Sequence, residues 1–421
     1  MSYKNIYILG VGGSGMSSIA KYLKQKGDNV IGYDQRKSYV TNLLNQDGIK
    51  VVHTLDEITY KPESLYIYSS AIPIESDRFE DFYDKENVLS RPEYLKNLSE
   101  NHKIIGITGT HGKTSTTALL SHIFHFNNVN VSYLYGGITT FNGIGGHYGD
   151  PDQPLILETD EAFNTFEKIK ISDLLVLNVD SDHLDYFKNL DNYKDAFYKV
   201  MKNVTDNLVI NNDDLNIKSM KELKNPVSYG KDIAADFKVQ SPGTFIYENN
   251  KYEIKSDIIG DHFKANMLGA IILALLNGIE IKDSLNAIES FAGVKRRIEL
   301  IGISKGVLIY DDYGHHPTEM EATITALKQQ TESKLYVVFQ PHRYTRTMEY
   351  FNSFKDSLKL ADFAIVTDIY PAGESPIPGI SSKNFEEENI KYLKSIRYVP
   401  EYLSKKVQNG DIVLTLGAGD I

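Results

Sequence analysis

The chain has 421 residues, of which 41% are hydrophobic and 24% charged, an ordinary composition for a globular protein of two or three domains. Its formal net charge of −11 argues against nucleic acid or an anionic membrane as the main partner, and the lack of cysteine excludes disulfides, a thiolate nucleophile and zinc–thiolate sites. The apolar run at 270–279 is too short to span a bilayer, and the N-terminus lacks the pattern of a signal peptide. We therefore expect a cytoplasmic enzyme or binding protein.

The first segment alternates short apolar runs with helical patterns. The predicted elements are a strand at 5–10, a helix at 15–27 closed by Gly27, a strand at 29–34 and a strand at 64–72. This order predicts a parallel sheet covered by helices. The polar stretch 93–103 then precedes a new strand at 104–109, so we assign residues 1–98 to a first domain.

The same rhythm occurs in two further segments. The central segment has predicted strands at 154–160, 173–179 and 207–213 and a helix at 263–279, and the last segment has predicted strands at 306–313, 334–342, 363–370 and 411–419. We therefore expect an α/β protein of three domains, with boundaries at 1–98, 99–292 and 293–421. Acidic residues that follow the central strands are well placed for a metal or a phosphate, because ligands of such sheets gather at the carboxyl ends of strands.

The first of two glycine-rich loops follows the first predicted strand. Gly10, Gly12 and Gly15 match G-x-G-x-x-G at the start of a helix, where glycine lets the backbone approach a pyrophosphate. Asp34 ends the next strand, where an acidic residue can hold ribose hydroxyls. The pattern predicts a nucleotide ligand and leaves NAD, FAD and a UDP-sugar open.

The second loop, "GITGTHGKTSTT" at 106–117, resembles a P-loop. Lys113 and Thr114 follow Gly112 at a helix start, where the lysine would contact the β- and γ-phosphates and the threonine could bind Mg²⁺. The strict motif fails, because Ile107 occupies the place of its first glycine.

At these residues the chain resembles the Mur ligases, which build the peptide stem of the bacterial cell wall. "TGTHGKTSTT" is similar to the family's ATP loop, and the blocks "GVGGSGMS", "SSAI", "FAGVKRR", "DDYGHHPTE", "FQPHRYTRT" and "GAGDI" follow in the family's order from residue 10 to residue 421. The resemblance implies a Rossmann-like domain that holds UDP, a central P-loop ATPase-type domain and a Rossmann-like C-terminal domain. The blocks most resemble the branch that joins L-alanine to the lactyl carboxylate of UDP-N-acetylmuramate.

The resemblance also implies the chemistry. The lactyl carboxylate attacks the γ-phosphate of ATP, and the amine of L-alanine displaces phosphate from the resulting acyl phosphate, with Mg²⁺ offsetting the repulsion between anions. The expected partners are UDP-N-acetylmuramate, L-alanine and ATP, with no nucleic acid and no membrane insertion, in a monomer or a homodimer. The implied catalytic residues are Lys113, Glu158, His183, Arg343 and Arg346, and the implied metal ligands are Thr114, Glu158 and His183.

Further residues are implied to contact the two nucleotides. Asn266 would read adenine, Arg297 would face a phosphate, and Asp311 and Asp312 would lie near the ribose of ATP. The remaining residues implied to bind ATP are Gly109, Thr110, His111, Gly112 and Ser115. Those implied to bind the sugar nucleotide are Gly12, Gly13, Ser14, Gly15, Met16, Asp34, Ser69, Ser70 and His342. Without the resemblance, two alternatives to these roles stay open. His183 would be a loop histidine paired with a neighbour, and one of Arg343 and Arg346 would form a surface ion pair.

The sequence departs from the family's pattern at a few places. "ETDEAF" has Thr159, Ala162 and Phe163 where the family has Ala, Ser and Asp, and Phe263 replaces an asparagine near Asn266. The family commonly continues past "GAGDI", where this sequence ends, so a short natural form and a truncated chain both remain open. Three alternatives also stay open: a recycling ligase that attaches a tripeptide to the same sugar nucleotide, a non-catalytic homologue that binds UDP-sugar, and a nicotinamide-dependent oxidoreductase.

Overall fold

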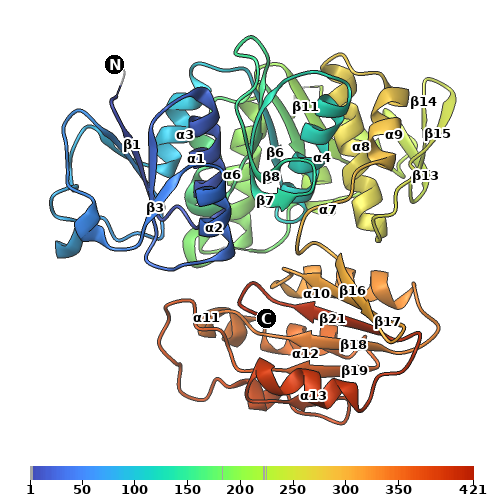
Figure 1. Cartoon of the computed structure of the whole chain (residues 1–421). Coiled ribbons are helices and arrows are strands. Elements are labelled where there is room, and N and C mark those ends of the chain that lie inside the picture. The colour runs from blue at the N-terminus through green and yellow to red at the C-terminus, as the bar shows by residue number, and fades with distance from the viewer. Residues whose placement is uncertain (1–2, 183, 221–222, 224) are drawn as a thin grey trace. The chain divides into compact units, whose positions relative to one another are not determined.

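The computed structural model describes residues 3–182, 184–220, 223 and 225–421, and Figure 1 shows the path of the chain. The chain forms two compact units. One contains Met1–Ser256 with Lys264–Ala292, and the other contains Asp257–Phe263 with Gly293–Ile421. The main segment of the second unit starts at residue 293, where the sequence predicts the third domain. The short segment 257–263 groups with the second unit, although its place in the sequence lies within the predicted central domain.

Five parallel strands form the first sheet, in the order β3-β2-β1-β4-β5. Its elements are β1 (Ile6–Leu9), α1 (Ser14–Lys26), β2 (Val30–Tyr33), α2 (Tyr39–Gln46), β3 (Lys50–Val52), β4 (Leu65–Tyr68), β5 (Val88–Ser90) and α3 (Arg91–Ser99). β1 is the middle strand, and all four of its residues are buried, as expected of a strand covered on both faces. Gly27 ends α1 with φ 98°, a left-handed conformation that glycine adopts without steric cost.

The polar stretch predicted at the first domain boundary is largely the helix α3. The Ser90 hydroxyl accepts from the Glu93 N–H while the Glu93 carboxylate accepts from the Ser90 N–H, a capping box that satisfies two N-terminal groups. Tyr94 and Leu95 then bury one side of the helix in the core of the unit. The helix places Arg91, its first residue, close to α1.

The second sheet has ten strands in the order β15-β14-β13-β12-β11-β10-β6-β9-β7-β8. The elements from β6 to α9 are β6 (Ile104–Thr108), α4 (Lys113–Phe126), β7 (Ser132–Thr139), β8 (Gly143–His147), β9 (Leu155–Glu158), β10 (Asp173–Val176), α5 (Leu184–Phe187), α6 (Leu190–Lys202), β11 (Asn207–Asn211), α7 (Leu215–Lys218), β12 (Val227–Gly230), β13 (Phe237–Ser241), β14 (Thr244–Tyr247), β15 (Asn250–Glu253), α8 (Asp261–Leu276) and α9 (Ile281–Glu289). The predicted central strands are confirmed as the parallel neighbours β9, β6, β10 and β11.

The antiparallel hairpin β7–β8 joins the two sheets into one unit, because it packs against α1 (Figure 1). A Cβ on Gly146 would lie 2.0 Å from the carbonyl oxygen of Ser18, so the hairpin can approach the helix this closely only without a side chain there. Lys21 of α1 donates to the carbonyl oxygens of Asn142 and Ile144. Burial at this contact lowers the pKa of the Lys21 ammonium, against the smaller opposing effect of Asp47.

The second unit is built on a sheet of six strands in the order β16-β17-β21-β18-β19-β20. Its elements are β16 (Glu299–Ser304), β17 (Val307–Asp312), α10 (Pro317–Lys328), β18 (Leu335–Phe339), α11 (Tyr344–Glu349), α12 (Phe351–Leu358), β19 (Phe363–Val366), β20 (Ile390–Tyr392), α13 (Val399–Ser404) and β21 (Ile412–Leu416). All strand pairs are parallel except β16 with β17. No helix among the residues that the structure describes is long and apolar enough to cross a membrane.

Candidate active site

The second glycine-rich loop connects β6 to α4 in a conformation that requires glycine. Gly109 and Gly112 have φ of 143° and 86°, which side-chain-bearing residues rarely adopt. A Cβ on Gly112 would lie 2.4 Å from Nδ2 of Asn266, so the Asn266 amide rests directly on the loop. The N-terminus of α4, with Thr114 and Ser115 in its first turn, therefore begins beside a backbone that can approach a phosphate closely. The adenine-reading role of Asn266 stays a prediction.

Lys113 is held by its own loop and by a buried carboxylate. Its ammonium donates to the carbonyl oxygens of Gly109 at 2.6 Å and Thr110 at 3.0 Å, and lies 2.8 and 2.9 Å from the two carboxylate oxygens of Glu161. The Glu161 side chain is 1% exposed. Burial alone would lower the pKa of Lys113, but Glu161 and the carboxylates of Asp160 and Glu158 outweigh it and raise the pKa. The lysine is thus positively charged beside the loop, as binding to phosphate requires.

The side-chain oxygens of Thr114 and Glu158 lie next to each other. The Thr114 hydroxyl donates to Glu158 Oε1 at 2.7 Å, and the N–H of Gly136 in β7 donates to Glu158 Oε2 at 2.6 Å. A hydroxyl oxygen and a carboxylate oxygen are ligands that Mg²⁺ prefers, so this pair fits the metal that the sequence predicts. The third predicted ligand, His183, lies outside the described residues.

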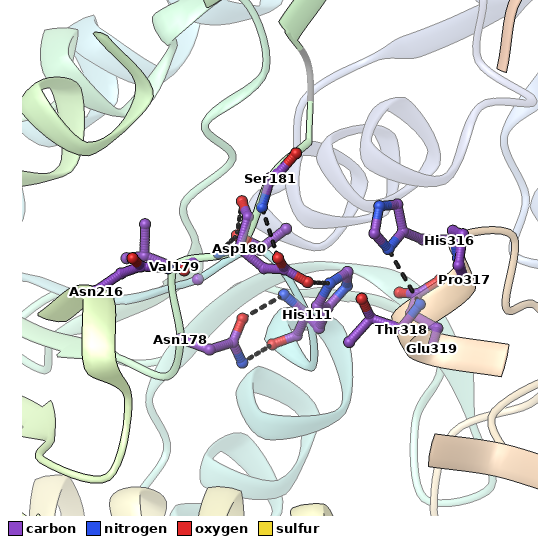
Figure 2. A network of polar contacts seen from close by, with 12 residues as sticks. His111, Asn178, Val179, Asp180, Ser181, Asn216, His316, Pro317, Thr318 and Glu319 are labelled. Atoms are coloured by element: carbon purple, nitrogen blue, oxygen red, sulfur yellow. Dashed lines mark hydrogen bonds and ion pairs between the residues drawn. The ribbon is translucent and has the colours of Figure 1, made fainter. Parts of the chain in front are cut away.

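A network of polar contacts fixes the middle of the loop against the end of β10 (Figure 2). The N–H of His111 donates to Asn178 Oδ1 at 2.8 Å, and Asn178 Nδ2 donates back to the carbonyl oxygen of His111 at 2.9 Å. His111 Nε2 lies 3.3 Å from Asp180 Oδ2, and the N–H of Asp180 donates to the Thr110 hydroxyl at 2.8 Å. Asn178 and Asp180 thereby orient Thr110 and His111 of the second glycine-rich loop.

The first glycine-rich loop and the central sheet line one open pocket of about 250 Å³. The loop and the first turn of α1 contribute Gly13, Ser14, Gly15 and Met16, and the chain after β4 contributes Ser69. The central sheet contributes Gly136 and Glu158, and the chain after β9 contributes Asp160. The predicted sugar-nucleotide loop and the predicted metal ligand Glu158 therefore face the same space. Ser70 follows Ser69 and is exposed.

Asp34 braces the first loop. Its carboxylate accepts from the N–H of Gly12 at 2.9 Å and from the N–H of Arg36 at 3.0 Å. A Cβ on Gly12 would lie 2.7 Å from Asp34 Oδ2, so glycine is needed for this contact. The ribose role of Asp34 stays a prediction, and the structure adds a role in shaping the loop.

The predicted nucleotide residues of the second unit take part in its own structure. Asp311 accepts from Arg296 Nε at 2.9 Å and from the Thr415 hydroxyl at 2.6 Å. Asp312 is buried and accepts from the N–H groups of Ile298 and Gly314, at 2.8 and 2.7 Å. Burial raises the pKa of Asp312 to about 6, in spite of Arg297 and these hydrogen bonds.

Within the same unit, Arg297 is held loosely. One guanidinium nitrogen lies 3.9 Å from Glu319 Oε1, and the guanidinium carbon lies 5.4 Å from the centroid of the Tyr313 ring. Arg297 thus makes weaker contacts than its neighbour Arg296, which donates to Asp311 and to the carbonyl oxygens of Gly417 and Gly419.

The block "QPHRYTRT" places its basic residues at the start of α11. Arg343 Nε donates to Glu374 Oε1 at 2.6 Å, so this arginine forms the ion pair considered as one alternative from the sequence. His342 stacks on Tyr370 with ring centroids 5.4 Å apart. Burial, together with Arg346 and Arg343, lowers the pKa of His342 to about 4, so its ring is neutral near pH 7. Arg346 lies one helical turn further, in α11.

Three family models match consecutive parts of the chain. Residues 5–103 match the model "Mur ligase family, catalytic domain", residues 107–274 match "Mur ligase middle domain", and residues 296–419 match "Mur ligase, glutamate ligase domain". The chain belongs to the Mur ligase family. The resemblance seen in the sequence is thereby confirmed across nearly the whole chain, and the two glycine-rich loops fall in different family domains.

Curated Mur ligases from several bacteria are similar over the full length. The UDP-N-acetylmuramate–L-alanine ligase of Caldicellulosiruptor saccharolyticus is 36% identical, covering 99% of this chain and 96% of that protein. The protein of the same description from Dictyoglomus turgidum is 35% identical, covering 100% of this chain and 95% of its own.

Solved structures of Mur ligases share the fold. The UDP-N-acetylmuramate–alanine ligase of Thermotoga maritima superposes with a TM-score of 0.82 at 24% identity, covering 99% of this chain and 96% of that one. A murein peptide ligase from Psychrobacter arcticus gives a TM-score of 0.71 at 22% identity, with the same coverage. These likenesses confirm the predicted three-domain α/β fold.

Two site residues of this Mur ligase were not singled out from its sequence. Glu161 stands in "ETDEAF" with no role implied by the resemblance, yet it is the carboxylate that pairs with Lys113. The resemblance implies no role for Arg91, yet this residue lines the shared pocket. A carboxylate three residues after Glu158 was visible in the sequence, but only the fold shows that its chain turns back to the lysine.

Proposed function

We propose that this Mur ligase joins L-alanine to the lactyl carboxylate of UDP-N-acetylmuramate, with ATP converted to ADP and phosphate. One observation carries the proposal most directly: a single pocket is lined by the first glycine-rich loop and by Glu158, which contacts Thr114 at the start of the ATP loop helix. The full-length similarity to curated alanine ligases supports the choice of amine.

Different residues would bind the two nucleotides. The N-terminus of α1, with Gly13 and Ser14, would hold the diphosphate of the sugar nucleotide, and Lys113 with the loop N–H groups would hold the phosphates of ATP. Thr114 and Glu158 would hold Mg²⁺, which when bound offsets the negative charge of the phosphates. In the second unit, the guanidinium groups of Arg343 and Arg346 would suit a substrate carboxylate.

The reaction then follows from bringing these anions together. The lactyl carboxylate attacks the γ-phosphorus of ATP, the bond to the β-phosphate oxygen breaks, and ADP leaves. The unprotonated amine of L-alanine attacks the carbonyl carbon of the acyl phosphate, the bond from this carbon to the phosphate oxygen breaks, and phosphate leaves with the proton that the nitrogen gives up. Lys113 stabilises the charge that develops on the transferred phosphoryl group, because its raised pKa keeps it protonated.

A phosphate-release assay tests the proposal. We expect release that requires UDP-N-acetylmuramate, L-alanine and Mg²⁺ together, and a product whose mass equals the sugar nucleotide plus one alanyl residue. A parallel reaction replaces L-alanine with the tripeptide L-alanyl-γ-D-glutamyl-meso-diaminopimelate. Release with the tripeptide and none with L-alanine would reassign the amine substrate, and no release with either, although ATP and UDP bind, would refute the ligase proposal.

A further inference from the structure

The pocket shared by the first glycine-rich loop and β9 is poor in positive charge. Glu158 and Asp160 line it, and a sugar nucleotide would bring in a diphosphate as well. Among the described residues that line the pocket, Arg91 is the one with a basic side chain. The repulsion between these anions has to be offset locally, because the chain as a whole carries a net charge of −11.

Arg91 lies against the first turn of α1. A Cβ placed on Gly15 would be 2.9 Å from Arg91 Nε and 3.1 Å from its Nη2, so the guanidinium crosses the helix where a side chain would otherwise stand. This contact gives a physical reason for the third glycine of G-x-G-x-x-G in this chain. The guanidinium is thus fixed beside the N–H groups that open α1.

The protein leaves most of the hydrogen-bonding capacity of Arg91 unused. Its Nη1 lies 3.5 Å from Asp160 Oδ2, and its buried Nε has no acceptor among the residues that the structure describes. A guanidinium has five N–H donors and binds two oxygens of one anion side by side. Asp160 itself is fixed, because its Oδ1 accepts from the N–H of Ala162 at 2.9 Å. Asp160 therefore holds the Arg91 guanidinium in place but leaves most of its N–H donors without an acceptor in the described part of the chain.

We propose that Arg91 binds the diphosphate of the sugar nucleotide, with Asp160 as the residue that positions its guanidinium. The diphosphate is favoured over the lactyl carboxylate because Arg91 contacts the helix N-terminus, where phosphate groups bind, and not the Thr114–Glu158 pair, where the carboxylate must meet ATP. This inference rests on the proposed function, since it assigns one group of the same substrate to one more residue.

Calorimetric titration of the full-length protein with UDP, without ATP, tests the assignment. We expect Arg91→Gln to weaken UDP binding at least tenfold, and Arg91→Lys to weaken it less, because a lysine keeps the charge but not the two-pronged geometry. The matched control is Lys96→Gln on the exposed side of the same helix, which removes one positive charge outside the pocket and should leave the affinity unchanged. The KM for ATP should stay within about twofold in all three variants.

The choice of ligand separates the two anionic groups. UDP, UDP-N-acetylglucosamine and UDP-N-acetylmuramate share the diphosphate, and only the last has the lactyl carboxylate, so we expect the same loss for all three. A loss confined to UDP-N-acetylmuramate, or UDP affinity in both Arg91 variants equal to that of the unsubstituted protein, would overturn the assignment. Failure of the unsubstituted protein to bind any uridine nucleotide would instead refute the proposed function.

Discussion

The ion pair between Lys113 and Glu161 makes a quantitative prediction for Glu161→Gln. Both side chains are largely buried, and the ammonium lies 2.8 and 2.9 Å from the two carboxylate oxygens. The substitution keeps the shape of the side chain but removes the carboxylate that contacts the ammonium directly. Removing one partner of a buried pair costs about 3 kcal/mol at the lower end of the usual range. This predicts a fall of roughly 6–12 °C in the melting temperature of the first unit.

ATP should restore much of this loss, because its phosphates supply the missing negative charge beside Lys113. We therefore expect saturating ATP with Mg²⁺ to raise the melting temperature of Glu161→Gln more than that of the unsubstituted protein. Differential scanning calorimetry with and without nucleotide measures both values. Glu167→Gln is the matched control, since Glu167 is exposed six residues further along and should change stability by less than about 0.5 kcal/mol. An unchanged melting temperature, or an equal ATP-induced rise in both proteins, would refute the reasoning.

Three further substitutions test other parts of the site. Lys113→Ala should abolish phosphate release while UDP binding by calorimetry stays nearly intact, and an equal loss of UDP affinity would contradict the division between the two loops. Gly136→Ala should lower kcat about tenfold with little change in ATP affinity, because the new Cβ would lie 3.1 Å from Ser14 Oγ and 3.4 Å from Glu158 Oε2 and would displace these groups. A kcat equal to that of the unsubstituted protein would show that Gly136 does not position them. Asp312 has a folded pKa of about 6, above its unfolded value, so the native state holds this proton more tightly. Its contribution to the free energy of unfolding should fall by about 3 kcal/mol in total as pH rises from about 3 to about 7, with most of the loss between the unfolded and the folded pKa. Urea unfolding of the second unit should show that dependence in the difference between the unsubstituted protein and Asp312→Asn, and a difference independent of pH would contradict it.

The sequence by itself determined the family, the α/β class and the two glycine-rich loops. These features are local: a strand, a glycine turn and a helix start lie within about a dozen residues, and each imposes its own residue types. Gly109 and Gly112 could be predicted for this reason, since their positive φ favours glycine whatever surrounds them, and Lys113 could be predicted because the loop motif places a lysine directly after the glycine.

Only the tertiary structure decided which residues from distant segments meet at the site. Arg91 follows Gly15 by 76 residues and stands just before the polar stretch 93–103, so its contact with that glycine depends on how α3 packs beside α1. The partner of Lys113 likewise depends on the turn after β9, which brings Glu161 back to the ATP loop. The physical reason is that the periodicity of apolar residues in the sequence specifies which face of a helix or strand is buried. Which charged residues of different elements meet is decided only when those faces pack against one another.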